Sequence, residues 1–214
     1  MSIITTAGAW IAFAPKAGLT TMHQYVGAGL AELDEMIVQH RSQRTTIICR
    51  DPLLRAISIY HYNMITMPYN NRYNQAIADA NDGKYNSLYD AIRSRYPQPS
   101  TRGLDAERFL YWIDQVLPNT IHTDGHTISQ TKSWRLPTGV QWRDRDIQWW
   151  CLQNLNQHLL QEFGWVPQQQ NRQAYHRKRA LKYLELEGVR DAIYTHYAED
   201  FEAYETALQQ QCLR

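Results

Sequence analysis

Short apolar runs alternate with segments of helical spacing in the first part of the chain. Residues 9–14, Ala-Trp-Ile-Ala-Phe-Ala, form one such run, and Pro15 closes it. Apolar positions then recur with a helical period from Leu19 to about Met36. A short apolar run followed by a helical period predicts a strand, a loop and a helix.

The same order of elements repeats further along. Residues 45–49, Thr-Thr-Ile-Ile-Cys, are β-branched and nearly continuous, as in a strand that is buried on both faces. Arg50 follows this run, and after Pro52 the apolar residues Leu53 and Ile57 keep helical spacing. Two strand-loop-helix units in succession predict a parallel sheet, with a ligand just beyond the carboxyl ends of its strands.

The rest of the chain is mainly helical in pattern. We expect a helix over 104–116 that Pro118 stops, and a helix over 146–163 that Gly164 ends. The C-terminal part predicts helices broken near Gly188. The expected fold class is therefore α/β, a parallel sheet flanked by helices with a helix-rich C-terminal part.

Length and charge narrow the class of protein. The chain has 214 residues, which suits one domain with a sizeable core. Lys and Arg total 22 against 21 for Asp and Glu, a net charge of +1, so we expect no sequence-blind binding of nucleic acid. No apolar run approaches the roughly 18 residues of a membrane span, and no basic residue precedes the apolar start, so we expect a soluble, cytoplasmic protein. The 3 cysteines are far apart and form no CxxC pair, so neither disulfides nor a metal site is expected.

The loop after the first predicted strand has features of a phosphate site. It reads Pro-Lys-Ala-Gly-Leu-Thr-Thr over residues 15–21 and opens the predicted helix. A helix N-terminus offers backbone N–H groups, Gly18 permits close approach, and Lys16 adds a positive charge. The nucleotide-triphosphatase loop requires Gly-Lys followed by Ser or Thr, and the only Gly-Lys pair in this chain precedes a tyrosine, which disfavours a standard ATPase or GTPase.

The loop after the second predicted strand offers a second set of anion donors. Arg50 stands at the strand end, and Ser58 follows two turns into the next helix, so both side chains can grip one oxyanion. Asp51 and Arg55 have a simpler interpretation, because a salt-bridged helix start uses the same residue types.

Together these two loops resemble the sulfotransferases that use 3′-phosphoadenosine 5′-phosphosulfate (PAPS) as donor. Residues 15–21 match the family pattern Pro-Lys-x-Gly-x-Thr-[Ser/Thr], and residues 50–60 match Arg-Asp-Pro-x-x-Arg-x-x-Ser-x-Tyr. The resemblance implies a single P-loop-like sulfotransferase domain over 1–214, with Arg50 and Ser58 on the 3′-phosphate. The residues implied at the 5′-phosphosulfate are Lys16, Ala17, Gly18, Leu19, Thr20 and Thr21, of which Leu19 stands where the family usually has a small residue.

Two further segments are similar to the Golgi carbohydrate sulfotransferases. Residues 126–130, His-Thr-Ile-Ser-Gln, resemble a His-Trp-x-Pro-Gln segment without its Trp and Pro, and residues 197–201 resemble a closing Tyr-x-x-Asp-[Phe/Tyr] helix. The resemblance therefore implies a carbohydrate hydroxyl as acceptor. Because the chain shows neither a membrane anchor nor a cysteine framework, the resemblance implies a soluble relative of these enzymes, of bacterial or viral type.

Sulfuryl transfer also needs a base to take the proton of the attacking hydroxyl. His126 is the first candidate, because it lies in a segment that the family matches. His23 is the second, since a helix rise of 1.5 Å per residue places it about 8 Å along the first predicted helix. Asp34 and Glu35 stay open.

Aromatic and basic clusters offer further surfaces for an acceptor. The tract 172–182 is the densest basic stretch. It closes over the nucleotide, attracts a sulfated or acidic acceptor, or forms a solvated helix face. Four tryptophans follow the His126 segment and offer flat surfaces to sugar rings, although Trp150 fits a core equally well: Trp134, Trp142, Trp149 and Trp150.

Two other functions fit parts of this pattern. A kinase-like phosphoryl transferase would use the same sheet with Mg²⁺ held by a carboxylate. A degenerate transferase would bind glycans or proteins through its aromatic face without turnover.

Overall fold

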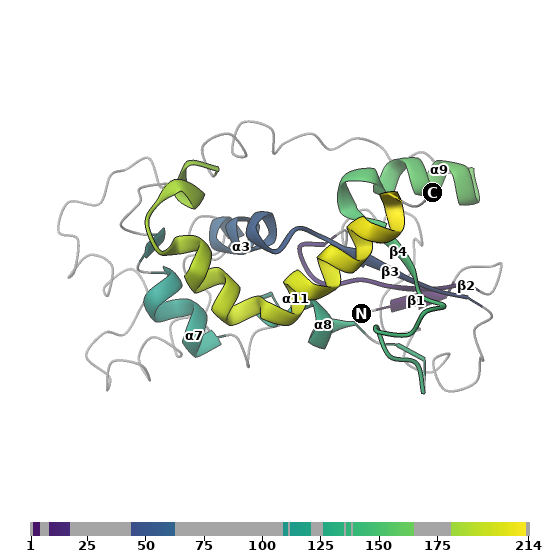
Figure 1. Cartoon of the computed structure of the whole chain (residues 1–214), viewed down its shortest axis with the longest axis horizontal. Coiled ribbons are helices and arrows are strands. Elements are labelled where there is room, and N and C mark those ends of the chain that lie inside the picture. Colours follow the sequence, from purple (N-terminus) through teal and green to yellow (C-terminus); the bar gives the residue numbers. More distant parts are fainter. Residues whose placement is uncertain are drawn as a thin grey trace. The chain divides into compact units, whose positions relative to one another are not determined.

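The structure is a computed structural model (Figure 1). The chain divides into two compact units. The first unit comprises residues 1–51, 129–170 and 199–214, and the second comprises 52–128 and 171–198. The residues that the structure describes are 2–4, 9–17, 44–62, 109–110, 112–120, 126–134, 136–137, 139–164 and 181–212. The predicted helix over 19–36 lies outside them.

The first unit contains a sheet of order β1-β2-β3-β4. Its strands are β1 (Ser2–Ile4), β2 (Ala9–Ala12), β3 (Arg44–Cys49) and β4 (Gln148–Cys151). Strands β2, β3 and β4 are parallel, and β1 pairs antiparallel with β2. The prediction of two parallel strands is confirmed at β2 and β3, and three parallel strands flanked by helices are compatible with the α/β class.

Both faces of the sheet are buried, as the continuous apolar pattern of β3 predicted. On one face Ile47 of β3 belongs to an apolar cluster with Trp10 of β2 and Trp149 of β4. Ala203 and Ala207 of the C-terminal helix pack in the same cluster, because their small side chains let the helix approach the strands. The alternate residues of the strands, such as Ile11, Ile48 and Trp150, are also buried.

Three helices complete the described part of the first unit. They are the short α8 (Gln130–Ser133), α9 (Leu155–Phe163) after a 3-10 turn at Leu152–Asn154, and the C-terminal half of α11 (Val189–Cys212). The prediction that Gly164 ends a helix is confirmed, because it adopts φ 65° at the C-cap of α9.

The predicted helix over 146–163 is wrong in its first part, where the structure has β4. The run Gln148-Trp-Trp-Cys151 pairs with the buried strand β3, a place that suits large aromatic side chains. Helical spacing of buried residues begins only with Leu155 and Leu159 of α9.

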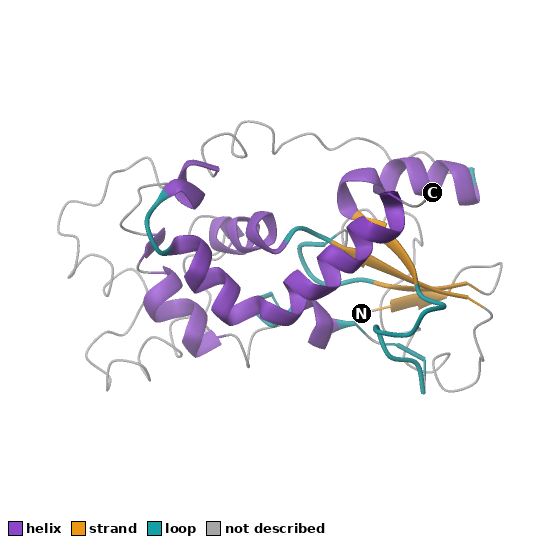
Figure 2. Cartoon of the chain, in the orientation of Figure 1, coloured by secondary structure: helices purple, strands orange, loops and turns teal. Residues whose placement is uncertain are grey.

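The second unit contains helices and loops but no strand among its described residues (Figure 2). Its elements are α3 (Pro52–His61), the π-helix η2 (Trp112–Val116), α7 (Leu117–Thr120), the 3-10 turn η4 (Lys182–Glu185) and the first part of α11. The predicted helix after Pro52 is therefore confirmed as α3. The predicted break near Gly188 is also confirmed, because this residue adopts φ 74° between η4 and α11.

Pro118 does not stop the helix that the sequence predicts over 104–116. The π-helix η2 passes into α7, and Pro118 lies in the first turn of α7. A proline inside a helical segment removes one intrahelical hydrogen bond, and the change from π-helical to α-helical turns lies directly before Pro118.

Aromatic side chains hold the second unit together. Tyr60 of α3 meets Phe109 edge to face at a ring-centroid distance of 4.9 Å, and Phe109 stacks on Tyr183 at 5.1 Å. Trp112 lies 5.8 Å from Tyr60. All four residues are buried, so this cluster is the core on which α3 is fixed.

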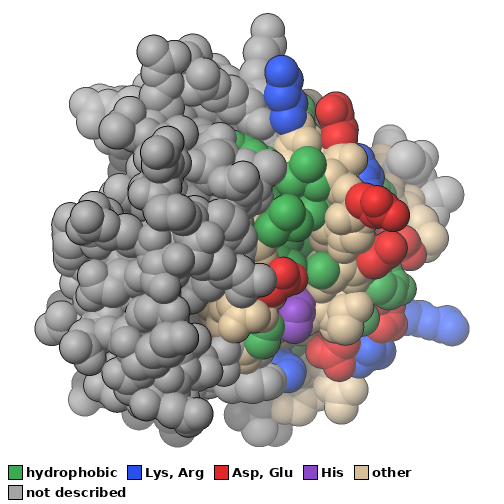
Figure 3. Space-filling model, turned by 90° about the vertical axis from the view of Figure 1, so that its left-hand side faces the viewer, with side chains coloured by type: hydrophobic (Ala, Val, Ile, Leu, Met, Phe, Trp, Pro, Cys, Tyr) green, Lys and Arg blue, Asp and Glu red, His purple; other side chains and the backbone are tan. Residues whose placement is uncertain are grey.

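Charged side chains of both signs are interspersed over the described part of the face in Figure 3. This distribution agrees with the net charge of +1. A helix of the length and apolar character that a bilayer crossing requires does not occur among the described residues.

Candidate functional site

Strand β2 ends in a tight turn that presents Lys16. The N–H of Ala17 donates to the carbonyl of Ala14 at 3.0 Å, with Pro15 and Lys16 at the two central positions. Lys16 has φ 62°, as the third residue of a type II turn requires, and Pro15 has the fixed φ that suits the second position. Glycine normally takes the third position, and a lysine there costs about 1 kcal/mol of backbone strain. Such an outlier beyond a strand end is typical of a functional position.

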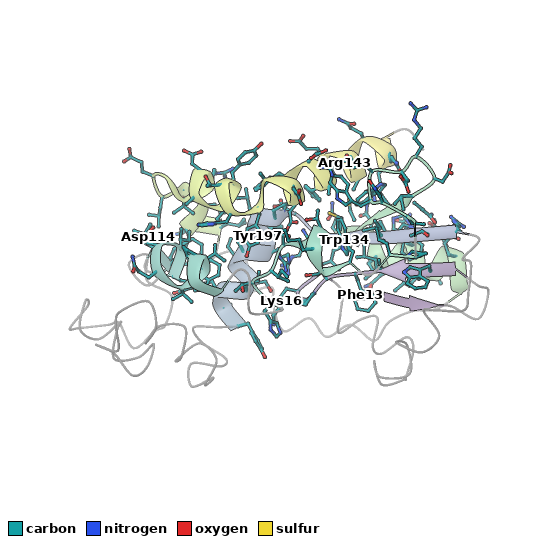
Figure 4. The ribbon with its side chains drawn as sticks, turned by 90° about the horizontal axis from the view of Figure 1, so that it is seen from below. Phe13, Lys16, Asp114, Trp134, Arg143 and Tyr197 are labelled. Carbon is teal, nitrogen blue, oxygen red and sulfur yellow. The ribbon has the colours of Figure 1, made fainter. Side chains whose placement is uncertain are left out.

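Arg50 follows β3, the neighbouring parallel strand, and reaches the Lys16 turn. Its Nη1 donates to the carbonyl of Lys16 at 2.7 Å. The two turns that the sequence singled out therefore lie side by side beyond the carboxyl ends of β2 and β3, and Figure 4 shows Lys16 beyond the end of its strand.

Burial and the charge of Arg50 change the acidity of Lys16. Burial first, and then the positive charge of Arg50, lower the pKa of Lys16 from 10.5 to about 8. Both effects disfavour the charged ammonium, and a bound anion would offset both. Lys16 still carries its charge at neutral pH, so the pair presents two neighbouring positive charges, the kind of group that a phosphate or sulfate site needs.

Lys16→Met is expected to raise the melting temperature at pH 7. The pKa of Lys16 is lower in the folded chain than in the unfolded chain, so the folded state binds fewer protons between pH 8 and 10.5. The cost of the buried charge is fully present below pH 8 and disappears as the pH rises through this window. Thermal unfolding of both proteins at several pH values checks this, and the difference in Tm is expected to shrink from pH 8 to 10.5. An equal Tm at pH 7 would contradict the buried charge.

Gln130 and Asp200, which sequence reasoning did not place in the site, support the loop at Arg50. The side-chain amide of Gln130 accepts from the N–H of Arg50 at 3.0 Å and donates to its carbonyl at 2.8 Å. Asp200 of α11 accepts from the N–H groups of Gln130 at 2.8 Å and Thr131 at 3.1 Å. The sequence did mark both residues, because they lie in the two segments that resemble carbohydrate sulfotransferases. Only the fold shows that Gln130 and Asp200 are in contact.

The other predicted site residues are engaged in the turn, lie outside the described residues, or belong to the second unit. The N–H of Ala17 closes the turn and is engaged there. Gly18, Leu19, Thr20 and Thr21 lie outside the described residues, as do His23, Asp34 and Glu35. Ser58 is partly buried on α3 in the second unit. The roles of all of these residues stay predictions.

His126 also belongs to the second unit, where its neighbours are well defined. Its ring is partly buried and stacks on Tyr62, with ring centroids 4.5 Å apart and planes 25° apart. Nη2 of Arg55 donates to the carbonyls of His126 at 3.2 Å and Ile128 at 2.7 Å. The hydroxyl of Tyr197 donates to the carbonyl between them, that of Thr127, at 2.6 Å. The backbone of this segment is therefore held by the buried side chains of Arg55 and Tyr197, and the His126 ring stacks on Tyr62.

The tryptophans that follow this segment are mostly core. Trp134, Trp149 and Trp150 are buried. The expectation of a surface for sugar rings is therefore wrong for Trp134 and Trp149, and of the two alternatives for Trp150 the core is confirmed. Their indoles fill the space around the sheet, and Trp134 meets Trp149 edge to face at 5.6 Å. Trp142 is partly buried, and the guanidinium of Arg143 lies 3.9 Å from its ring centroid.

The basic tract adds little to the described site. Residues 172–180 lie outside the described residues, and Lys182 is exposed at the start of η4. Among the residues that the structure describes, no group of three or more His, Cys, Asp or Glu side chains is placed to hold a metal ion.

Comparison with known proteins gives no match: no protein-family model, no curated protein and no solved structure is significantly similar to this chain.

Proposed function

We propose that this protein is a sulfotransferase that moves a sulfuryl group from PAPS to a hydroxyl of a carbohydrate. One observation carries the proposal: the guanidinium of Arg50 donates to the carbonyl of Lys16, so cationic residues of two separate motifs meet beyond adjacent parallel strands. The resemblance requires this meeting, because both motifs must bind one nucleotide. The P-loop-like identity of the sheet is part of the same proposal.

Each described cation has a task in this reaction. An acceptor oxygen bonds to sulfur while the bond from sulfur to the 5′-phosphate oxygen breaks, and adenosine 3′,5′-bisphosphate leaves. The ammonium of Lys16 stabilises the negative charge that develops on the leaving oxygen. The guanidinium of Arg50 offers planar donors to the 3′-phosphate, for which the resemblance implies Ser58 as a second donor. The acceptor proton goes to a base, and the resemblance offers His126 or His23 for this role.

A transfer assay with radiolabelled PAPS tests the proposal. The purified protein is incubated with panels of glycans, phenols and peptides, and labelled products are separated from the donor. We expect label on a glycan without added Mg²⁺. Label transferred only from γ-labelled ATP with Mg²⁺ would indicate the kinase-like alternative, and acceptor binding without any transfer would indicate a binding module.

Arg50→Ala is expected to weaken the binding of adenosine 3′,5′-bisphosphate by about 1.5 to 3 kcal/mol, the size of a charge-assisted hydrogen bond. The backbone of the loop at residue 50 should keep its conformation in this variant, because the Gln130 bonds join the backbone of that residue. Calorimetric titration measures the change.

Arg44→Ala is the matched control for this variant. Arg44 stands at the opposite end of the same strand and bonds to Glu162 at 3.2 Å. Its removal should leave the affinity for the bisphosphate unchanged. An equal loss of affinity in both variants would point to a general effect of charge and would contradict a specific role for Arg50.

A further inference from the structure

The amide of Gln130 fixes the backbone at the end of β3. Strand β3 ends at Cys49, and the register with β4 ends at the same residue. One residue further, Gln130 bonds to both the N–H and the carbonyl of Arg50. Two bonds from one planar amide to one residue reproduce what a neighbouring strand provides, so they hold Arg50 in position and in direction.

Gln130 is itself fixed by burial and by hydrogen bonds. It has no exposed surface, and it opens α8, where Ser129 caps the helix by accepting from the N–H of Lys132. The buried carboxylate of Asp200 accepts from the N–H groups of Gln130 and Thr131 with its two oxygens. Because these contacts fix the backbone of Gln130, its side-chain amide can hold the Arg50 backbone in one position.

The contact continues from Arg50 to Lys16. Arg50 is the residue whose guanidinium bonds to the carbonyl of Lys16, in the strained position of the β2 turn. Any shift of the Arg50 backbone therefore displaces both cations of the candidate site. Displacements on the order of 1 Å at such positions are large enough to weaken the binding of an oxyanion.

We infer that Gln130 is a positioning residue for the Lys16–Arg50 pair, and that Asp200 holds Gln130 in place. The inference rests on the proposed function for its ligand, the two phosphate groups of a 3′-phosphorylated adenosine nucleotide. The side chain of Gln130 bonds to the backbone of Arg50, so it acts on the guanidinium through that backbone.

A buried glutamine that only fills the core would have a different signature. Its loss would lower stability and leave nucleotide affinity unchanged. Gln148 provides the matched control, because it is buried in β4 of the same unit and its amide bonds to Thr46 at 3.1 Å and Glu162 at 3.4 Å. Methionine has a similar volume to glutamine, so Gln130→Met and Gln148→Met remove the amide and preserve packing.

Calorimetric titration with adenosine 3′,5′-bisphosphate, together with the Tm of each protein, separates the two roles. We expect Gln130→Met to raise Kd about tenfold or more, as loss of a group that orients a ligand does, and Gln148→Met to leave Kd unchanged despite a lower Tm. Equal Kd values in Gln130→Met and wild type would overturn the inference.

A second measurement needs no nucleotide. Amide hydrogen exchange in the free protein should be faster at Arg50 in Gln130→Met than in Gln148→Met, because only the first variant removes the acceptor of that N–H. Failure of the wild-type protein to bind the bisphosphate would overturn the proposed function, and the exchange rate would still decide the positioning: faster exchange at Arg50 supports it, and unchanged exchange overturns it.

Discussion

Lys16→Ala is expected to reduce the rate of sulfuryl transfer by about 10²–10³-fold or more, the size of effect found when one preorganised group that stabilises developing charge is removed. The Lys16 ammonium is partly buried, so water screens it less than an exposed lysine, and its charge is correspondingly more effective on the leaving oxygen. Transfer of labelled sulfate at saturating acceptor measures the loss.

Two controls separate this effect from misfolding and from net charge. The Ala14–Ala17 bond that closes the turn involves no Lys16 atom, so Lys16→Ala should keep the backbone and unfold no more easily than wild type. Lys132→Ala removes an exposed lysine of α8 in the same unit and should transfer sulfate at the wild-type rate. Wild-type turnover in Lys16→Ala would remove Lys16 from the reaction.

Arg55→Met is expected to lower the free energy of unfolding by about 3 kcal/mol, the cost of breaking a buried, hydrogen-bonded charge site. Arg55 is 1% exposed, and its Nη2 donates to the carbonyls of His126 and Ile128. Its guanidinium also lies 5.6 Å from the ring centroid of Tyr197. Methionine fills much of the space but leaves both carbonyls without these bonds.

Urea unfolding followed by circular dichroism measures this change. Arg190→Met is the matched control in the same unit, because Arg190 also donates to a carbonyl, that of Leu184 at 3.0 Å, but its side chain is exposed. We expect the control to change stability by less than about 0.5 kcal/mol, as for most surface substitutions. Equal unfolding midpoints for Arg55→Met and wild type would show that the carbonyl contacts contribute nothing.

Arg50 and Arg55 show where local sequence reasoning stops. The motif places both within one short segment, and the sequence predicts a salt-bridged helix start for Arg55. The guanidinium of Arg55 also bonds to carbonyls more than 70 residues away in the chain, which the sequence did not predict. Contacts over such separations depend on which segments the fold brings together, and the pattern around Arg55 contains no record of them.

Some helices and strands follow from the local sequence pattern, and others depend on contacts with distant segments. Strands β2 and β3 and helix α3 follow from local pattern, because each has a continuous apolar run or a helical period between clear boundaries. Strand β4 does not, because Gln-Trp-Trp-Cys becomes a strand only by pairing with β3. The Gln130 and Asp200 contacts were likewise unpredictable as a pair, although each residue lies in a segment that the resemblance had marked.

A crystal structure with adenosine 3′,5′-bisphosphate tests the central claim most directly. The 5′-phosphate is expected within about 3 Å of the Nζ of Lys16, and the 3′-phosphate at the same range from the guanidinium of Arg50. A nucleotide bound at another surface, or one that contacts only one of these two cations, would contradict the account.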